Sequence, residues 1–446
     1  MDIVLTVNSP GEVAAWLTPA VRALRRRAPS STITVCIPPC TFASGAEAGV
    51  VASLPEVDRV IPPKAFLAYL FFGRRPPGWQ PGREGAVCFL GGDLLYAAWL
   101  ARRLRYPALA YTEGRVQWEK SYQVFMVPDR KAEERALRSK AAREQVVMIG
   151  DLMLDAVEPK SPDKAAARHL LGIEDGEILL ALFPGSRPFE LQAMLPFFLR
   201  TVEIVAQALS TLNLRLQVLV SLSPFINPDL LAAAAAHTPP GMEGSVAEIR
   251  SGGGSSTIEA SIPGVKTWTL VTGKLEVTAY QGCQYDCMLA SDLALTVPGS
   301  NTMEMAYFGL PMVVAVPLNR AEDIPLEGLP GLIGSIPLVG PRIKKAAVHR
   351  LATRVRFTAL PNRRAGQKVV PEVIGQIQPA DLAIPLVELA RQPQKRAAVS
   401  ERLRQIAGSK GAAAKLAELV VETAEGWNER NGRAGDYGDR RAAKRS

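Results

Sequence analysis

The stretch DLALTVPGSNTMEMAYFGLPMVVAV, residues 292–316, decides the fold of its half of the chain. It opens with a short apolar run typical of a buried strand, which the turn cluster PGSN at 298–301 ends. A helix is predicted next, capped by Ser300 or Asn301 and stopped by Gly309. A second apolar run follows, so the stretch predicts one βαβ unit.

The turn before that helix is suited to an anion. Gly299, Ser300, Asn301 and Thr302 leave backbone N–H groups unpaired at a helix N-terminus, where the macrodipole also favours a phosphate. Glu304 lies one turn further in, and its carboxylate suits the two hydroxyls of a ribose rather than a phosphate. The alternative is an ordinary strand-turn-helix in which Glu304 is only a favourable first-turn charge.

Length and composition indicate a globular protein of two or three domains. The chain has 446 residues, of which 48% are apolar and 21% charged. No uninterrupted apolar run reaches the roughly 18 residues of a membrane span, so we do not expect an integral membrane protein. The N-terminus enters a strand pattern without a basic and apolar leader, which favours the cytoplasm.

The charge balance is basic, with 52 Lys and Arg against 43 Asp and Glu. Such a balance attracts phosphates, nucleic acid or an anionic membrane surface, but no nucleic-acid recognition motif is present. Residues 427–446 are charge-rich and are predicted to be a disordered basic tail. The five cysteines include no CxxC pair, so we expect reduced structural thiols and no metal site.

Strands alternate with helices from the first residues onward. In the first half of the chain, the strand-like runs are residues 2–7, 32–37, 86–90, 108–111, 123–127 and 146–149. The alternation predicts a mainly parallel sheet covered on both faces, in which ligands bind at the carboxyl ends of strands. Glu12, after Gly11, and Asp93, after Gly92, each follow such an end. The alternative for Asp93 is a helix cap.

An aromatic segment, IPPKAFLAYLFFGRRPPGWQPGR, occupies residues 61–83. It is too short to cross a bilayer, but apolar residues edged by arginines and a tryptophan suit a lipid interface or an acyl-chain groove. The alternative is a core helix followed by a proline-rich loop. The residues expected to make the lipid contact are Phe66, Phe71, Phe72, Arg74, Arg75 and Trp79.

The second half begins after EPKSPDK, residues 158–164, which is predicted to be a linker. A strand at 177–183 runs into the turn 184–187, where Arg187 can pair with a diphosphate in fork geometry. The glycine-rich SGGGSS at 251–256 is predicted to be a loop rather than a phosphate cradle, because no strand enters it and no lysine follows.

Three stretches resemble lipid-A-disaccharide synthase in their order and spacing. They are LALFPGSRPFEL, SDLALTVPGSNTMEMAYFGLPMVV and LPNRRAGQKVVPEVI. The turn at Glu304, with its following Gly-Leu-Pro, is also similar to the glycosyltransferase that completes lipid II. The resemblance is strong over roughly residues 177–377, except for an insertion in the middle of this range that it does not cover. It is weak before residue 150.

The resemblance implies an α/β fold of GT-B type, in which two Rossmann-like αβα domains face each other across a cleft and a helical C-terminus follows. We expect an acceptor-side domain at residues 1–157 and a UDP-sugar-binding domain at 165–375. Helices at 376–426 and the tail at 427–446 complete the expected division.

The resemblance also implies an inverting glycosyltransferase without a cofactor, peripheral at the inner face of the cell membrane. The family uses UDP-2,3-diacylglucosamine as donor and 2,3-diacylglucosamine 1-phosphate as acceptor. Asp93 would be the general base, while Arg187 and helix N-termini would neutralise the departing diphosphate. The residues expected to bind the UDP-sugar are Gly185, Ser186, Arg187, Gly299, Ser300, Asn301, Thr302, Glu304 and Asn362.

The acceptor side departs from the family pattern. The synthases begin with Gly-Glu-Ala-Ser-Gly-Asp, whereas this chain has NSPGEVAAW and keeps only Gly11 and Glu12. Asp151 stands where the synthases usually carry a histidine. The choice of Asp93 or Glu12 as base therefore stays open. So do two other functions, a UDP-N-acetylglucosamine epimerase and a non-catalytic nucleotide-sugar or lipid-binding protein, and the oligomeric state is not predicted.

Overall fold

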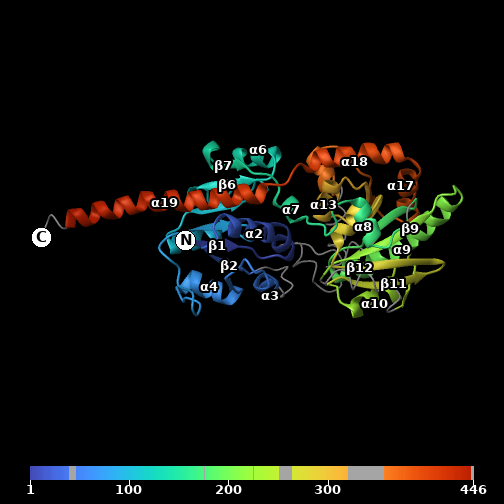
Figure 1. The fold of residues 1–446 in the computed structure, drawn as a ribbon, viewed down its shortest axis with the longest axis horizontal. Helices are drawn as coiled ribbons and strands as arrows, with labels where there is room; N and C mark the ends of the chain where they lie inside the picture. The colour runs from blue at the N-terminus through green and yellow to red at the C-terminus, as the bar shows by residue number, and fades with distance from the viewer. Residues whose placement is uncertain are drawn as a thin grey trace, which may run out of the picture. The chain divides into compact units, whose positions relative to one another are not determined.

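The computed structural model describes the backbone of residues 1–39, 47–139, 141–174, 176–224, 226–250, 264–319 and 356–442, with side chains as far as residue 427. The chain divides into two compact units (Figure 1). Unit 1 consists of residues 1–157 and 409–446, and unit 2 consists of residues 158–408. Each unit is built on its own sheet and is described by itself.

The sheet of unit 1 is entirely parallel, with strand order β3-β2-β1-β4-β5-β6-β7. Its strands are β1 (Asp2–Thr6), β2 (Thr32–Cys36), β3 (Arg59–Ile61), β4 (Gly85–Phe89), β5 (Ala108–Tyr111), β6 (Val124–Val127) and β7 (Val146–Met148). Six of these strands confirm the apolar runs found in the sequence, and the additional strand is the three-residue β3 at the edge.

Helices cover both faces of this sheet, as its alternating side chains require. They are α1 (Pro10–Glu12), a π-helical turn (Val13–Leu17), α2 (Thr18–Arg27), α3 (Glu47–Ala52), α4 (Pro63–Phe72), α5 (Leu94–Leu104), α6 (Arg130–Arg138), α7 (Leu152–Ala156) and α19 (Ala412–Ala442), with 3₁₀ turns at Glu119–Ser121 and Arg143–Gln145. Ile3 and Leu5 pack with α2 and α19, whereas Val4 packs with α4 and α5.

The sheet of unit 2 has the order β10-β11-β12-β9-β8-β13-β14-β15. Its strands are β8 (Ile178–Phe183), β9 (Leu216–Leu222), β10 (Glu248–Arg250), β11 (Lys266–Thr272), β12 (Leu275–Gln281), β13 (Leu293–Thr296), β14 (Met312–Pro317) and β15 (Glu372–Gly375). Only β11 pairs antiparallel, with β10 and β12, and the other neighbours are parallel. The central strands and the helix α13 confirm the predicted βαβ unit.

The described helices of unit 2 are α8 (Lys164–Leu170), α9 (Pro188–Ser210), α10 (Pro228–Ala236), α12 (Gln284–Ala290), α13 (Asn301–Phe308), α16 (Leu360–Ala365), α17 (Pro379–Arg391) and α18 (Pro393–Ala407). Helix α9 is long and apolar enough to cross a membrane by length and composition. However, Leu195, Phe197 and Phe198 are fully buried in a core shared with α10 and α17. We therefore regard α9 as a core helix.

The helices after residue 376 are divided between the units. Helices α17 and α18 belong to unit 2, whereas α19 belongs to unit 1 and packs against α2. The carboxylate of Asp155 ties down the start of α19 by accepting hydrogen bonds from the Gly411 and Ala413 amides, each at 2.7 Å. Helix α19 runs through most of the segment predicted to be a tail, and residues 443–446 lie outside the described part, as does the predicted loop at 251–256.

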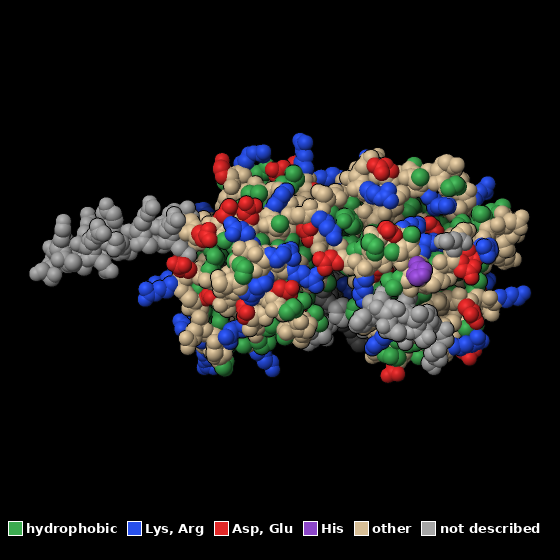
Figure 2. Space-filling view, in the orientation of Figure 1, with side chains coloured by type: hydrophobic (Ala, Val, Ile, Leu, Met, Phe, Trp, Pro, Cys, Tyr) green, Lys and Arg blue, Asp and Glu red, His purple; other side chains and the backbone are tan. Residues whose placement is uncertain are grey.

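Basic and acidic side chains are mixed on the face of the molecule that is drawn in Figure 2. Some of the described basic residues are paired with carboxylates, as Arg25 is with Asp58 at 2.7 Å. Such exposed pairs contribute little to stability, and each one reduces the local attraction of anions.

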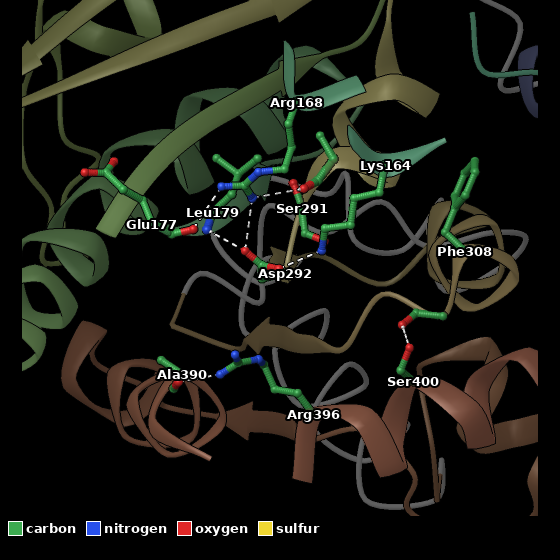
Figure 3. A network of polar contacts seen from close by, with 12 residues as sticks. Lys164, Arg168, Glu177, Leu179, Ser291, Asp292, Phe308, Ala390, Arg396 and Ser400 are labelled. Atoms are coloured by element: carbon green, nitrogen blue, oxygen red, sulfur yellow. Dashed lines mark hydrogen bonds and ion pairs between the residues drawn. The ribbon is translucent and has the colours of Figure 1, made fainter. Parts of the chain in front are cut away.

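Asp292 fixes the amino ends of two central strands in unit 2 (Figure 3). Its carboxylate accepts from the Leu179 amide at 2.9 Å and pairs with Lys164 at 2.6 Å and Arg168 at 3.3 Å. Burial alone would raise the pKa of Asp292, but these partners lower it below its ordinary value. The network therefore joins α8, β8 and β13 at the edge of the sheet opposite the turns that follow those strands.

Candidate functional site

Two turns of unit 2 come together at the carboxyl edge of its sheet. Strands β8 and β13 are parallel neighbours, and Phe183 at the end of one pairs with Thr296 at the end of the other. The turns after them, residues 184–187 and 297–300, therefore start side by side. This is the edge at which α/β sheets bind ligands.

The turn at the start of α13 keeps free amide groups. The Asn301 side chain donates to the Thr296 hydroxyl at 2.7 Å, and the Thr302 hydroxyl donates to the Gly299 carbonyl at 2.8 Å. Ser300 occupies the N-cap position without a side-chain cap. Among the described groups, none accepts a hydrogen bond from the backbone N–H of Ser300 or Asn301. These amides are available to an anion at the positive end of the helix.

Glu304 lies in the first turn of α13 and has lost much of its hydration. Its side chain is only partly exposed, and burial raises the pKa of Glu304 to about 7. In the described part of the chain, no group donates a hydrogen bond to its carboxylate. A desolvated acceptor without a donor is costly unless a ligand supplies one.

The neighbouring turn after β8 is closed by a residue of its own helix. The Glu190 carboxylate accepts from the amides of Ser186 at 3.0 Å and Arg187 at 3.1 Å, and it pairs with the Arg187 guanidinium at 3.2 Å. Gly185 has φ +110°, and a Cβ there would lie 2.5 Å from the Glu190 Cβ. The sequence predicts that this turn receives a diphosphate, and in the structure the Glu190 carboxylate accepts from the two amides that such an anion would use.

The prediction that the Asn362 side chain binds the UDP-sugar is wrong. Its side chain is fully buried, and its amide nitrogen donates to the Val370 carbonyl at 2.9 Å and the Glu372 carboxylate at 2.7 Å. Its amide oxygen accepts from the Val369 and Val370 amides at 2.7 and 3.0 Å. Because a carboxamide has two donors and two acceptor positions, nothing remains for a ligand. Asn362 instead fixes the segment between α16 and β15.

In unit 1, Glu12 lies against the glycine turn that precedes Asp93. Its Oε2 accepts from the amides of Asn8 at 3.4 Å and Ser9 at 3.3 Å, and a Cβ on Gly91 would lie 2.0 Å from that atom. Burial raises the pKa of Glu12, although the Asn8 amide and other hydrogen bonds oppose the shift. Gly11 has open space where a Cβ would stand. The Glu12 carboxylate therefore stabilises the loop that precedes it by hydrogen bonds to the amides of that loop.

Asp93 is both a helix cap and an exposed carboxylate. Its Oδ1 accepts from the Leu95 amide at 2.8 Å at the start of α5. It also lines an open depression of about 480 Å³. The other lining residues are Leu95, Arg115, Gln117 and Trp118. The Glu12 carboxylate is thus engaged with its own loop, whereas Asp93 lines the depression.

Sequence reasoning missed Arg115, Gln117 and Trp118. They follow β5, and β5 is the parallel neighbour of β4, whose end leads to Asp93. The rule that ligands bind at the carboxyl ends of strands would have drawn attention to this loop. Asp151, which stands in the family's histidine position, is buried and caps α7 by accepting from the Met153 amide at 3.1 Å.

The aromatic segment contributes both core and surface. Phe66 and Trp79 are buried, packing on Tyr96 and Tyr69 respectively, so their expected lipid contact is wrong. The exposed rings form an apolar surface patch. Its members are Phe71, Phe72 and Trp99, with exposed fractions of 48%, 75% and 44%.

Basic residues border this patch. The Phe71 ring lies edge-on to Trp99 at 5.7 Å, and the Arg74 guanidinium lies 5.9 Å from the centre of the Phe72 ring. Arg75 is exposed beside Arg74. Trp99, which comes from α5, was not found from the sequence because it is 27 residues beyond Phe72. Its helix and α4 bring the rings together.

Within the described residues, no three His, Cys, Asp or Glu side chains are grouped as metal ligands. Cys36, Cys88, Cys283 and Cys287 are buried free thiols, and Cys40 lies outside the described residues.

Comparison with known proteins finds a likeness that lies mostly in unit 2. The family model described as lipid-A-disaccharide synthetase matches residues 134–238 and 257–322, which contain both turns and Glu304. The lipid-A-disaccharide synthase of Syntrophus aciditrophicus (strain SB) is 25% identical over 280 residues, or 62% of this chain and 57% of that protein. That of Bordetella parapertussis is 31% identical over 169 residues, or 37% and 35%. The chain thus spans about half the length of the curated relatives it matches.

Among solved structures, the wall teichoic acid polymerase TagF is similar over 96% of this chain and 90% of its own. The TM-score is 0.50 and the identity 11%, so this likeness concerns the fold alone. Two α/β units with mainly parallel sheets and helices at the C-terminus make up the GT-B fold class, which confirms the class expected from the sequence.

Proposed function

We propose that this chain is a member of the lipid-A-disaccharide synthase family and an inverting glycosyltransferase that takes its sugar from a UDP-sugar bound by unit 2. The observation that carries the proposal is the first turn of α13. The amides of Ser300 and Asn301, for which the described residues offer no acceptor, lie one helical turn before Glu304, a desolvated carboxylate without a described donor. A nucleoside diphosphate has an anion for the first and two ribose hydroxyls for the second.

The same turn stabilises the leaving group. Negative charge on the diphosphate grows as the bond to the sugar breaks, so amides and a helix dipole aimed at it favour the transition state over the bound substrate. Arg187 adds a guanidinium at the adjacent turn, where it now pairs with Glu190. In the proposed complex, the diphosphate takes over part of that pairing.

The acceptor is proposed to bind unit 1 at Asp93. The acceptor hydroxyl attacks the anomeric carbon while the bond to UDP breaks, so the electron pair leaves with UDP and the proton passes to the Asp93 carboxylate. Following the family, we propose UDP-2,3-diacylglucosamine as donor and 2,3-diacylglucosamine 1-phosphate as acceptor. The Glu12 carboxylate holds the neighbouring loop in place.

An acylated acceptor requires the enzyme to meet a lipid surface, because each methylene removed from lipid costs about 0.8 kcal/mol. We therefore propose peripheral binding at the cytoplasmic face of the membrane through the apolar surface patch. Phe71, Phe72 and Trp99 supply contact area, and Arg74 and Arg75 attract anionic headgroups.

The proposal is tested by thermal stabilisation of the purified protein with UDP and a panel of UDP-sugars. A ligand that binds only the folded state at 100 times its Kd stabilises by about 2.7 kcal/mol. We expect UDP to stabilise the wild type and Glu304→Gln to lose about 1.5–3 kcal/mol of that binding free energy. Glu133→Gln, which alters a first-turn glutamate of α6, is the matched control. If UDP stabilised the wild type and the Glu304→Gln protein equally, Glu304 would not be a ligand of the ribose.

A further inference from the structure

The depression beside Asp93 has the size and the mixed chemistry of a small-ligand site. Its volume of about 480 Å³ falls within the range of pockets that bind small molecules. It combines a carboxylate from Asp93, a guanidinium from Arg115, an amide from Gln117 and an indole from Trp118. All of these residues belong to unit 1, so the depression exists independently of the donor site.

The loop that carries Arg115 and Trp118 is firmly anchored. The Tyr122 hydroxyl donates to the carbonyl of Leu94, the residue after Asp93, at 2.6 Å. Gln145 donates to the carbonyls of Glu119 and Tyr122 at 3.1 and 2.8 Å. On the other side, Gly114 lies so close to α6 that a Cβ would stand 2.4 Å from a backbone oxygen. The loop is therefore fixed with respect to Asp93.

Trp118 has a strained backbone. Its φ of 57° and ψ of 39° lie in the left-handed region, which bulky residues avoid, and its side chain is 51% exposed. An exposed ring gains little from packing, so burial does not repay the strain. Strain of this kind concentrates at functional sites. It presents one indole at the wall of the depression.

Arg115 is available as an anion receptor. Its guanidinium donates to the Gln117 side-chain oxygen at 2.9 Å, which orients it. No described carboxylate lies within ion-pair distance of it. Of its five N–H donors, most remain for a ligand. A planar guanidinium binds a phosphate through two parallel hydrogen bonds.

We propose that Trp118 and Arg115 are the residues of this depression that recognise the acceptor, with the sugar ring stacked on Trp118 and the phosphate held by Arg115. The inference rests on the proposed function, because it assigns two recognition residues to the sugar phosphate that is proposed to bind next to the base. Asp93 then faces a hydroxyl of the stacked ring. Gln117 is a positioning residue that acts through Arg115.

The test measures the binding of glucosamine 1-phosphate and of glucosamine to the full chain by ligand-observed NMR titration. We expect the wild type to prefer the phosphate-bearing sugar at least tenfold. Arg115→Gln should abolish that preference and leave glucosamine binding unchanged. Arg130→Gln, an exposed arginine of α6, is the control and should keep the preference. A wild type without the preference, or an Arg115→Gln protein that retains it, overturns the assignment.

Trp118→Gly tests the ring contact. Glycine suits the left-handed backbone, so this variant should unfold at the wild-type temperature or above it. It should weaken binding of both sugars by a similar factor of ten or more, and wild-type affinity for both would overturn the stacking.

UDP binding, measured in parallel on every variant, separates this inference from the proposed function. It should be unchanged throughout. If UDP fails to bind the wild type while Arg115→Gln still loses the phosphate preference, the proposed function fails and the sugar-phosphate site stands.

Discussion

Three glutamates stand four residues after a turn residue, and the structure uses them differently. Glu12 and Glu190 reach back and accept from the amides of Asn8 and Ser186 respectively. Glu304 has the same spacing from Ser300 but makes no such contact among the described groups. The sequence analysis singled out Glu12 and Glu304 but not Glu190, and spacing alone does not say which of the three carboxylates is open to a ligand. Loop geometry decides that.

The raised pKa of Glu304 predicts a pH dependence of UDP binding. Ribose hydroxyls donate to the ionised carboxylate, so protonation below about pH 7 should weaken binding, by up to tenfold per pH unit. We expect the affinity of the wild type to fall between pH 8 and 5.5. The Glu304→Gln protein should show only the titration of the diphosphate itself, and the difference between the two proteins isolates Glu304. Identical profiles would contradict the assignment.

The contribution of Glu304 to folding stability should change with pH in the direction opposite to that of UDP binding. The pKa of Glu304 is 4.5 in its ordinary state and about 7 in the folded protein. Its contribution to stability is therefore fully present below about pH 4.5 and is lost as the pH rises through about 7. At pH 8 the Glu304→Gln protein should be at least as stable as the wild type. A loss of UDP binding at this pH would therefore not result from unfolding of the variant.

At the scale of elements, apolar periodicity predicted the central strands, and the structure confirms them. The hairpin of β11 and β12 was missed, although its polar and apolar residues alternate and Gly273 at φ +56° turns it. The aromatic segment shows a limit of composition. Phe66 and Tyr69 lie on the buried face of α4, whereas Phe71 and Phe72 are exposed. The composition of the segment does not show which face of α4 packs into the core that it shares with α5.

The apolar surface patch predicts membrane binding by one end of α4. Phe72→Glu combined with Arg74→Glu removes an exposed ring and reverses a charge, each of which opposes contact with anionic lipid. We expect sedimentation of the protein with anionic vesicles to fall at least fivefold, since each charge near the surface is worth about 1 kcal/mol. UDP binding should be unaffected.

Val246→Glu combined with Arg138→Glu is the matched control, because it changes an exposed apolar residue and an exposed arginine elsewhere. Undiminished sedimentation of the Phe72→Glu, Arg74→Glu protein would show that the patch does not contact lipid.

At the scale of the whole molecule, the family likeness and the chemistry divide in the same way. The residues proposed to bind the donor lie in one turn and the helix after it, so they are close in sequence and fall within the matched region. The depression in unit 1 is assembled from Asp93 and residues 115–118 on separate loops. No fixed spacing connects them, and the sequence alone pointed only to Asp93.

The return of α19 to unit 1 was equally hidden from the sequence. Its apolar side chains, including Leu416 and Val420, are fully buried in the core that contains β1 and α2. An amphipathic pattern predicts a buried face but does not say which sheet that face covers.

The most direct test of glycosyl transfer is UDP release from UDP-2,3-diacylglucosamine in the presence and absence of 2,3-diacylglucosamine 1-phosphate. We predict release, with formation of the disaccharide phosphate, only when both are present. Asp93→Asn should reduce it about 10²–10⁴-fold, because asparagine can still cap α5 but cannot take the proton. Release of UDP without acceptor, epimerisation of the sugar, or an undiminished rate in Asp93→Asn would contradict the account.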